Sequence, residues 1–439
     1  MIAAPPTTRP AVDESVAREI ALQKLVTAFI CTGLVFLLLP GTFLGVWNLI
    51  AISDRREAHS LSAAWIQAHG QAQMFGWIGT FVIGIGFYSL LKMSGLKPFV
   101  IRRGWESWAL WTSGVALHWI ANVYQWYWRM LLPVSTLLML AGFLLFFASV
   151  RRHRPKRGDI PVIRKPQMWM RLIQCSTFAF LTCLIVNAGA SLCMAVRGGG
   201  PALPPSSEAH LLLLTVWGFL VITVWGFNAR WLPVFAGLKE PSERGLKLAL
   251  VFLVTALITG LAGIPSVCAA LLIGASAIGT GALHVFERSA HPAKVQNIHR
   301  SFPHFVRIAY VWLLAAAVLA LGAALFDRNG GVTGASRHAV TVGFLGTMVF
   351  AIGCRVLPAF CGMKILFSPR LMFYALALLN FGCFLRVACE IPAYELNAVF
   401  AWNILPVSAV AELAAVTLFA FNLLATFIQV PAHLQTRRA

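Results

Sequence analysis

Charged residues are scarce in this sequence. They make up only 11% of its 439 residues, whereas hydrophobic residues make up 59%. A soluble domain carries about 25% charged residues, so this chain lacks the polar side chains that would cover a water-exposed surface. This excludes a soluble enzyme, a disordered chain and a nucleic-acid-binding module. A polytopic membrane protein remains, because lipid covers the apolar surface of such a protein.

Acidic residues are scarcer than basic ones, which gives a formal net charge of +20. The basic residues lie in short segments between long apolar runs, a pattern that reflects membrane topology rather than nucleic-acid binding. With the N-terminus placed inside, 28 of the 35 Lys and Arg residues fall in inner segments, and six fall in outer loops. This asymmetry predicts that both termini are cytoplasmic and that the number of spans is even.

The apolar runs predict an all-α fold with about twelve transmembrane helices, because about 20 apolar residues cross a bilayer core of ~30 Å. The first run is long enough to hold a break at Pro40-Gly41. The seventh and eighth runs are separated only by Gly263-Ile264-Pro265. The expected spans are 22–51, 62–91, 105–125, 127–150, 168–196, 208–235, 246–263, 264–286, 303–326, 337–357, 370–391 and 398–428.

Two markers recur along the chain with a period of ~135 residues, which indicates an internal repeat. The first marker is a histidine at the outer side of an even-numbered helix: His69, His210 and His338. The second is a proline near the start of every fourth helix: Pro133, Pro265 and Pro406. Three four-helix units of one sense predict a pseudo-threefold bundle rather than inverted repeats.

The repeat divides the chain into three transmembrane units joined by cytoplasmic segments. The predicted order is a cytoplasmic N-terminal segment (1–21), repeat one (22–150), a basic cytoplasmic loop (151–167), repeat two (168–288), a cytoplasmic loop (289–302), repeat three (303–428) and a cytoplasmic C-terminal tail (429–439).

Four histidines in the outer half of the expected bundle are candidate ligands. His69 and His118 lie about seven residues, or ~10 Å, from the outer ends of their helices. His210 and His338 are expected in first helical turns. An imidazole that faces lipid is costly, so these rings should point into the bundle. Neutral imidazole is the usual axial ligand of haem iron and also binds copper. We therefore expect His69, His210 and His338 to converge as metal ligands around at least one b-type haem, beside small residues: Gly70, Gly76, Gly218 and Gly343.

Charged side chains near these helices suggest further contacts. Arg197 and Arg337 are candidate partners of haem propionates, because guanidinium binds carboxylate bidentately; solvated arginines are the alternative. Glu412 lies inside the last span, where a carboxylate is costly unless it is paired. Pairing with Arg386 is the structural interpretation, and a proton-conducting role is the functional alternative.

At these residues the chain resembles the NnrS family. The resemblance rests on residues 69–76, on the His210 helix, and on residues 337–344 with the following Arg355, and it covers most of the twelve-helix core by pattern. NnrS-like proteins are bacterial inner-membrane proteins associated with haem, copper and the nitric oxide response. The resemblance therefore implies that location, those cofactors, a diatomic gas such as nitric oxide as ligand, and a redox partner.

NnrS-like proteins in turn resemble subunit I of the haem-copper oxidases, whose second and tenth helices hold a low-spin haem. Carried over, His69 and His338 would be the axial pair and His210 the sixth-helix metal ligand. His118 would be an alternative axial ligand, or a hydrogen-bond donor to a bound diatomic. The oxidases also have a histidine pair near helix 7, whereas residues 246–263 contain no histidine. A conventional oxygen-reducing centre cannot be assembled from this sequence.

Three functions remain open at this point. The first is a haem-binding protein of the nitric oxide response. The second is an oxidase-like or nitric-oxide-reductase-like redox subunit, which would make the chain an oxidoreductase. The third is a multi-span transporter in which the histidines bind substrate or protons. Haem absorption would separate the first two from the third.

Overall fold

The computed structural model describes residues 9–57, 60–94, 100–152, 167–293 and 297–429. In these ranges the chain is helical and contains no strand. The helical segments join end to end into twelve long rods, four of which contain a π-helical segment. Eleven rods are long and apolar enough to cross a membrane. The twelfth, Ile101–Val123, has charged residues in its first turns.

The four rods with a π-helical segment are α1–η1–α2, α3–η2–α4, α8–η3–α9 and α13–η4–α14. Their bounds are α1 (Arg9–Phe36), η1 (Leu37–Phe43), α2 (Leu44–Arg55), α3 (Ala63–Gln71), η2 (Ala72–Gly79), α4 (Thr80–Ser94), α8 (Pro205–Leu213), η3 (Leu214–Val221), α9 (Ile222–Phe235), α13 (Gly331–His338), η4 (Ala339–Gly346) and α14 (Thr347–Phe360). The other rods are α5 (Ile101–Val123), α6 (Trp128–Arg152), α7 (Met168–Arg197), α10 (Glu243–Leu261), α11 (Pro265–Ala282), α12 (Phe302–Phe326), α15 (Pro369–Leu396) and α16 (Val399–Ile428).

The all-α polytopic fold and its twelve helices are confirmed. The division between the seventh and eighth spans is real, because Gly263 has a φ of +78° and α11 starts at Pro265. The expected break at Pro40 is instead a π-helical turn, η1, and the rod continues through it. Most of the basic loop 151–167, the start of the N-terminal segment and almost all of the C-terminal tail lie outside the described residues. The division into three repeats stays a prediction.

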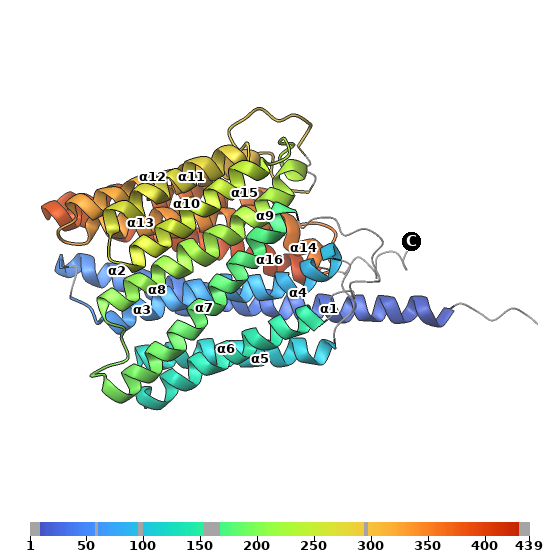
Figure 1. Cartoon of the computed structure of the whole chain (residues 1–439), viewed down its shortest axis with the longest axis horizontal. Coiled ribbons are helices and arrows are strands. Elements are labelled where there is room, and N and C mark those ends of the chain that lie inside the picture. Colours follow the sequence, from blue (N-terminus) through green and yellow to red (C-terminus); the bar gives the residue numbers. More distant parts are fainter. Residues whose placement is uncertain (1–8, 58–59, 95–99, 153–166, 294–296, 430–439) are drawn as a thin grey trace, which may run out of the picture.

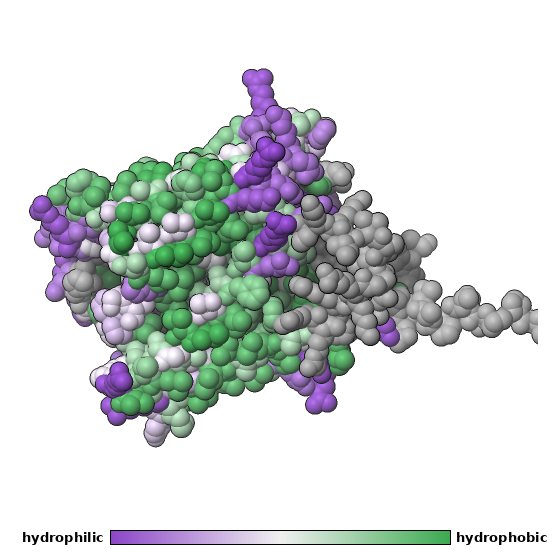
Figure 2. Space-filling model, in the orientation of Figure 1, coloured by the Kyte–Doolittle hydropathy of each residue, from purple (hydrophilic) through white to green (hydrophobic). Residues whose placement is uncertain are grey.

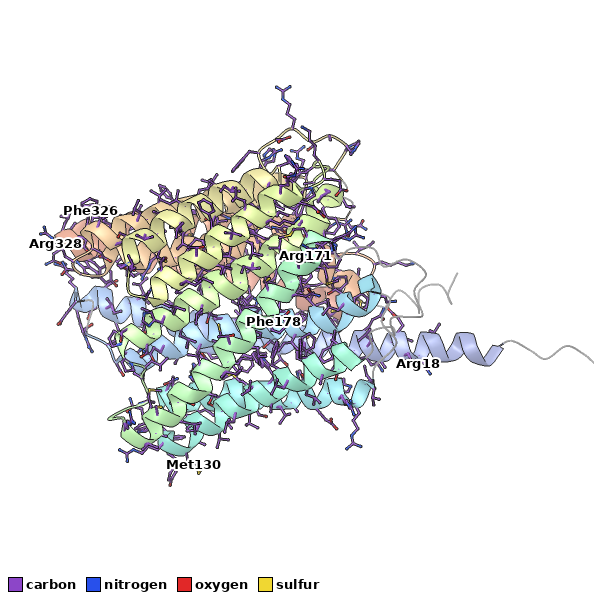
Figure 3. All side chains as sticks on the ribbon, viewed as in Figure 1. Arg18, Met130, Arg171, Phe178, Phe326 and Arg328 are labelled. Carbon is purple, nitrogen blue, oxygen red and sulfur yellow. The ribbon has the colours of Figure 1, made fainter. Side chains whose placement is uncertain are left out.

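The rods run side by side along the long axis of the molecule (Figure 1). An apolar belt covers the middle of the surface, and hydrophilic side chains gather at its two ends (Figure 2). Arg18 and Arg171 lie toward one end, which we name the basic end, and Met130 and Arg328 lie at the other (Figure 3). We name that second end the histidine end, because His69 and His338 lie in the halves of their rods nearest to it. This arrangement makes the chain a multi-pass membrane protein.

Three of the rods with π-helical segments form the centre of the bundle. In α3–η2–α4, α8–η3–α9 and α13–η4–α14, 67–78% of the most apolar stretch is buried, against 28–44% in seven of the other spans. Aromatic rings join these central rods to their neighbours. Phe219 stacks on Phe180 of α7, and Phe350 stacks on Phe419 of α16, each with ring centroids 3.9 Å apart. The central rods therefore carry the side chains that are shielded from lipid.

Candidate functional site

The histidines of the central rods lie next to π-helical segments. Segment η2 begins three residues after His69, and η4 begins at the residue after His338. A π-helical turn shifts backbone groups out of the α-helical hydrogen-bond pattern, and such turns occur frequently at functional sites. Two helices of the bundle centre therefore have an irregular backbone beside a histidine.

His69 is held by the first rod of the chain. Its Nδ1 lies 2.9 Å from the carbonyl oxygen of Gly41, in the π-helical segment η1. The imidazole packs on the backbone of Gly45, where a Cβ atom would lie 2.5 Å from the ring carbon Cε1. A carbonyl oxygen can only accept a hydrogen bond, so the proton of the neutral ring is on Nδ1 and the lone pair is on Nε2.

His338 is held in the same tautomer by two acceptors. Its Nδ1 lies 3.0 Å from the carbonyl oxygen of Gly334 and 3.2 Å from Oε2 of Glu390. In the part of the chain that the structure describes, no hydrogen bond reaches Nε2 of His338 or of His69. In its neutral form each imidazole therefore offers an Nε2 lone pair, with Nδ1 fixed by a neighbouring acceptor. Ligating histidines in metalloproteins have this arrangement.

Glu390 is also the partner of Arg386, one helical turn earlier in α15. Its two carboxylate oxygens each accept a hydrogen bond of 3.1 Å from the guanidinium. Both side chains are buried, with relative exposures of 10% and 5%. The expected pair between Arg386 and Glu412 is therefore wrong, because the i,i+4 spacing within one helix brings Glu390 closer. The i,i+4 spacing of Arg386 and Glu390 in the sequence indicates their ion pair. The contact of Glu390 with His338 was missed, because it joins two different rods.

Glu412 of α16 faces the same group of side chains without a hydrogen bond. Its Oε1 atom is buried and has no partner among the described residues. Its Cγ packs against Gly382 of α15, where a Cβ would lie 2.7 Å away. The carboxylate interacts electrostatically with His338, Arg386 and Glu390. A buried carboxylate oxygen without a partner is costly and needs an explanation.

The two histidines also lie near each other. His69 is close enough to His338 and to Arg386 for charges on these groups to affect one another, although the three residues lie on three different rods. We call the group His69, His338, Arg386, Glu390 and Glu412 the histidine-end cluster. One nitrogen of Arg386, Nη1, is buried without a hydrogen-bond partner in the described part of the chain. The cluster thus combines two imidazole lone pairs with an unpartnered guanidinium nitrogen and an unpartnered carboxylate oxygen.

His210 and Arg337 do not join this cluster. Both side chains are exposed. Segment η3 begins four residues after His210, whereas η2 begins three residues after His69. Each residue turns a helix by about 100°, so the two histidines point in different directions relative to their π-helical segments. His210 is therefore not part of the histidine-end cluster, and Arg386, not the exposed Arg337, is its buried arginine.

His118 lies at the contact between α5 and α6. It is buried, with 7% of its surface exposed. Ser135 donates its hydroxyl proton to the carbonyl oxygen of Leu132 at 2.6 Å, so its oxygen accepts from Nδ1 of His118 at 3.2 Å. The neighbouring Trp119 donates to the carbonyl oxygen of Pro40 at 3.2 Å. His118 therefore has a structural partner within the first third of the chain.

Three of the four glycines expected to make room for a cofactor are used for helix packing. A Cβ on Gly76, Gly218 or Gly343 would meet Phe36, Leu257 or Trp312, respectively, at 2.5–3.1 Å. Gly70 differs from them. The nearest atom to a Cβ there would be Cε of Met74 at 3.9 Å, an ordinary van der Waals distance, so a Cβ would fit at this position without displacing a neighbour.

The donor set of the cluster fits a haem and does not fit a copper ion. Two neutral imidazoles with free Nε2 lone pairs are a sufficient axial set for haem iron. A protein copper site takes several His or Cys ligands. No group of three or more His, Cys, Asp or Glu side chains in the described ranges is placed to hold a metal ion.

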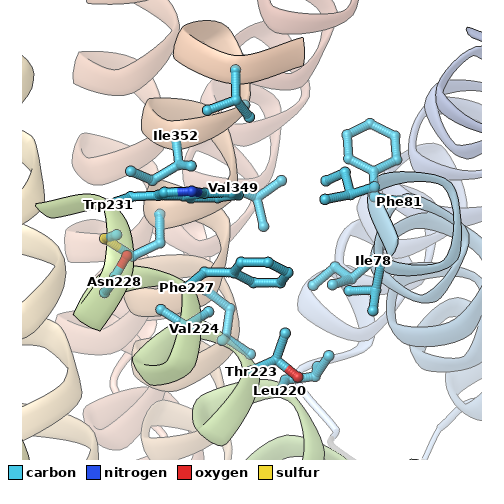
Figure 4. Close-up of a pocket in the computed structure, with 16 residues that line it drawn as sticks. Ile78, Phe81, Leu220, Thr223, Val224, Phe227, Asn228, Trp231, Val349 and Ile352 are labelled. Atoms are coloured by element: carbon cyan, nitrogen blue, oxygen red, sulfur yellow. The ribbon is translucent and has the colours of Figure 1, made fainter. Parts of the chain in front are cut away.

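An apolar cavity of about 80 Å³ lies between the three central rods, on the basic side of the π-helical segments. Ile78 and Phe81 line it from one side, and Phe227 and Trp231 line it from the other (Figure 4). Pockets for cofactors or drug-sized ligands usually enclose ~300–1,000 Å³. This cavity is therefore suited to a molecule of a few atoms and not to a macrocycle.

Comparison with known proteins places the chain in a family. A family model described as "Domain of unknown function (DUF8744)" matches residues 176–427, which is more than half of the chain. The chain belongs to the DUF8744 family. A search of curated protein sequences found no match.

This DUF8744 chain is similar in structure to a chain of a heme-copper terminal oxidase dimer. The TM-score is 0.52 with 11% sequence identity, and the match covers 94% of this chain and 85% of the oxidase chain. At this identity the similarity establishes the fold alone. The DUF8744 chain thus has a fold of the heme-copper oxidase type, and the expected distant similarity to those oxidases is confirmed.

Proposed function

We propose that this DUF8744 protein is a haem-binding redox protein of the membrane, with His69 and His338 as the axial ligands of a b-type haem. One observation carries the proposal. Both imidazoles lie in central rods with Nδ1 bonded to a fixed acceptor, which leaves the Nε2 lone pair free.

The residues around the two histidines would set their properties. A bound haem would supply one-electron chemistry at this position. The carbonyl of Gly41 orients His69, and the carboxylate of Glu390 orients His338 and makes its ring more basic. Arg386 neutralises Glu390 and has a nitrogen left over for a further acceptor, such as a cofactor carboxylate.

The location and the physiological role form the second part of the proposal. Resemblance to the NnrS family supports the bacterial inner membrane and a role in the nitric oxide response. The excess of Lys and Arg at the basic end supports a cytoplasmic position for that end and for both termini. Nitric oxide is a small apolar molecule of a size that the central cavity admits.

If both axial positions are histidine, a diatomic ligand must take the place of one of them. His69 is held by one backbone acceptor, whereas His338 is held by two acceptors including a carboxylate. His338 would therefore be the more firmly held of the two haem ligands. Copper is left out of the proposal, because the described residues do not assemble a ligand group for it.

Haem content and nitric oxide titration test this function. The purified full chain should contain about one haem b per molecule, and its reduced Soret band should change as nitric oxide is added. If the protein contains haem but its Soret band does not respond to nitric oxide, the protein is an electron-transfer protein. The second part of the proposal is then wrong. A colourless protein that does not bind added haem would contradict the first part and favour a transporter. Rapid oxygen consumption with an added donor would favour the oxidase alternative.

A further inference from the structure

A second pocket lies at the basic end, far from the histidine-end cluster along the rods. It is an open depression of about 540 Å³ between the start of α12 and the start of α15. Its lining is mostly basic and aromatic: His299, Arg300, Ser301, His304, Arg370, Phe373 and Tyr374. Its volume lies within the range of ordinary ligand pockets.

The positive charges of this pocket are not neutralised within the described part of the protein. Arg300, His304 and Arg370 are exposed, and no carboxylate among the described residues pairs with any of them. The nearby carboxylate of Glu287 is already bound by Lys239 and His284. The pocket therefore offers two guanidinium groups and an imidazole to a ligand of negative charge.

Two helix N-termini add to this positive field. α12 begins at Phe302, directly after Ser301, and α15 begins at Pro369, directly before Arg370. The backbone N–H groups of these first turns are largely bonded to His299, Ser301 and Ser368, and the dipole of each helix N-terminus still favours an anion. Two such termini and two arginines converge on one pocket, so the site is built from independent contributions.

The floor of the pocket is aromatic and continues into the lipid-facing surface. Phe373 of α15 packs against Phe305 of α12 with ring centroids 6.0 Å apart, and against the ring of His299 at 4.9 Å. Tyr374 is 55% exposed, and Val311 further along α12 is 53% exposed. A ligand with an anionic head in the pocket could thus place an apolar tail along α12 and α15.

We propose that this pocket binds the phosphate of an anionic phospholipid headgroup in the leaflet at the basic end. A guanidinium group binds phosphate bidentately, and basic pockets between transmembrane helices are known to bind anionic headgroups. A free phosphate ion would use the same arginines but would gain nothing from the exposed apolar faces below the pocket. The lipid therefore accounts for both the charge and the position of the site.

The proposal can be tested by native mass spectrometry of the delipidated full chain in detergent. The probes are phosphatidylglycerol, phosphatidylcholine with the same acyl chains, and inorganic phosphate as a competitor. The test variant is R300Q/R370Q. The matched control is R171Q/R244Q, which removes two exposed arginines at the same end but outside the pocket. The variant R300K/R370K retains the charge and shows whether charge alone restores lipid binding.

We expect the wild type and the control to bind phosphatidylglycerol equally, and R300Q/R370Q to bind it roughly 30-fold more weakly. R300K/R370K should recover most of this loss. Equal binding by the wild type and R300Q/R370Q would overturn the proposal. Equal binding of phosphatidylcholine would overturn the charge argument, and displacement of the lipid by an equal concentration of inorganic phosphate would show a free-anion site instead. Melting curves show whether each variant is folded. If R300Q/R370Q is unfolded, the single variants R300Q and R370Q are measured in its place.

Discussion

Nδ1 of His338 lies 3.2 Å from Oε2 of Glu390, the same oxygen that accepts a hydrogen bond from Nε of Arg386 at 3.1 Å. This relationship joins an imidazole of a central rod to a buried ion pair of a neighbouring rod. The carboxylate fixes the tautomer of His338, and the guanidinium offsets the free-energy cost of burying the carboxylate. The histidine and the ion pair therefore act as one unit.

Removal of the Glu390 carboxylate should be far more damaging than removal of a similar carboxylate at the surface. In Glu390→Ala the buried Arg386 loses its partner, which costs about 3–5 kcal/mol of unfolding free energy. Glu106→Ala is the matched control, because Arg102 and Glu106 form an exposed i,i+4 pair. Such exposed pairs contribute about 0.3–0.5 kcal/mol. Denaturation in detergent measures both, and equal losses would show that the buried pair has no special role.

Gly45→Ala should displace His69 without touching any charged group. A Cβ at this position would lie 2.5 Å from Cε1 of the imidazole, so the ring must move from its place beside Gly41. We expect loss of most of the bound haem. Gly189→Ala is the control, because a Cβ there meets no atom within 4 Å. That helix should gain about 0.5–1 kcal/mol from the substitution. Unchanged haem content in Gly45→Ala would contradict the assigned position of His69.

Asp327 caps the helix that carries His338, and its contribution should depend on pH. Its carboxylate accepts backbone N–H bonds from Gly330, Val332 and Thr333 at 2.8–3.3 Å, and a bond from the Thr333 hydroxyl. Burial raises the pKa of Asp327, but the hydrogen bonds with Thr333, Glu395 and Val332 outweigh burial and leave the pKa below its ordinary value.

A carboxyl with a lowered folded-state pKa stabilises the protein above its unfolded pKa of about 3.9, and this contribution is lost as the pH falls through the lower folded value. Asp327→Ala should therefore cost about 1 kcal/mol at pH 7. The difference in melting temperature between wild type and variant should shrink below about pH 4. A difference that stays constant over this range would mean that the carboxylate charge is irrelevant to the cap.

Single cysteines can test the orientation of the bundle. In a Cys193→Ser background, which removes the exposed native cysteine, Gly199→Cys lies in the loop between α7 and α8, and Glu240→Cys lies in the loop between α9 and α10. A membrane-impermeant maleimide added to intact cells should label position 199 and spare position 240. The reverse pattern would overturn the predicted cytoplasmic position of the basic end.

The rods could be predicted from sequence because lipid imposes a simple rule on them. Apolar length determined their number, and Gly263 with Pro265 correctly marked the short connection between α10 and α11. The π-helical segments could not be predicted, because they leave the apolar composition of a span unchanged. They nevertheless control the direction of the side chains. The position three residues before η3, equivalent to that of His69, is Leu211, and the neighbouring His210 is exposed.

The candidate site could be predicted only in part for a similar reason. His69 and His338 stood out as histidines inside apolar spans, and the structure places them near each other on two central rods. The acceptors that fix their tautomers are a backbone carbonyl in η1 and a carboxylate in α15. Contacts between distant rods leave no local pattern in sequence. The spacing of Arg386 and Glu390 was the one local signal of the cluster.

The absorption spectrum of purified histidine variants tests the central claim most directly. His69→Ala and His338→Ala should each lose the sharp reduced α and β bands and most of the haem. His210→Ala and His118→Gln should keep both, because His210 is exposed and His118 is bonded to Ser135. All four variants should be checked for folding by size-exclusion chromatography. If folded His69→Ala and His338→Ala retain the wild-type spectrum and haem content, these histidines are not the axial ligands and the account is contradicted.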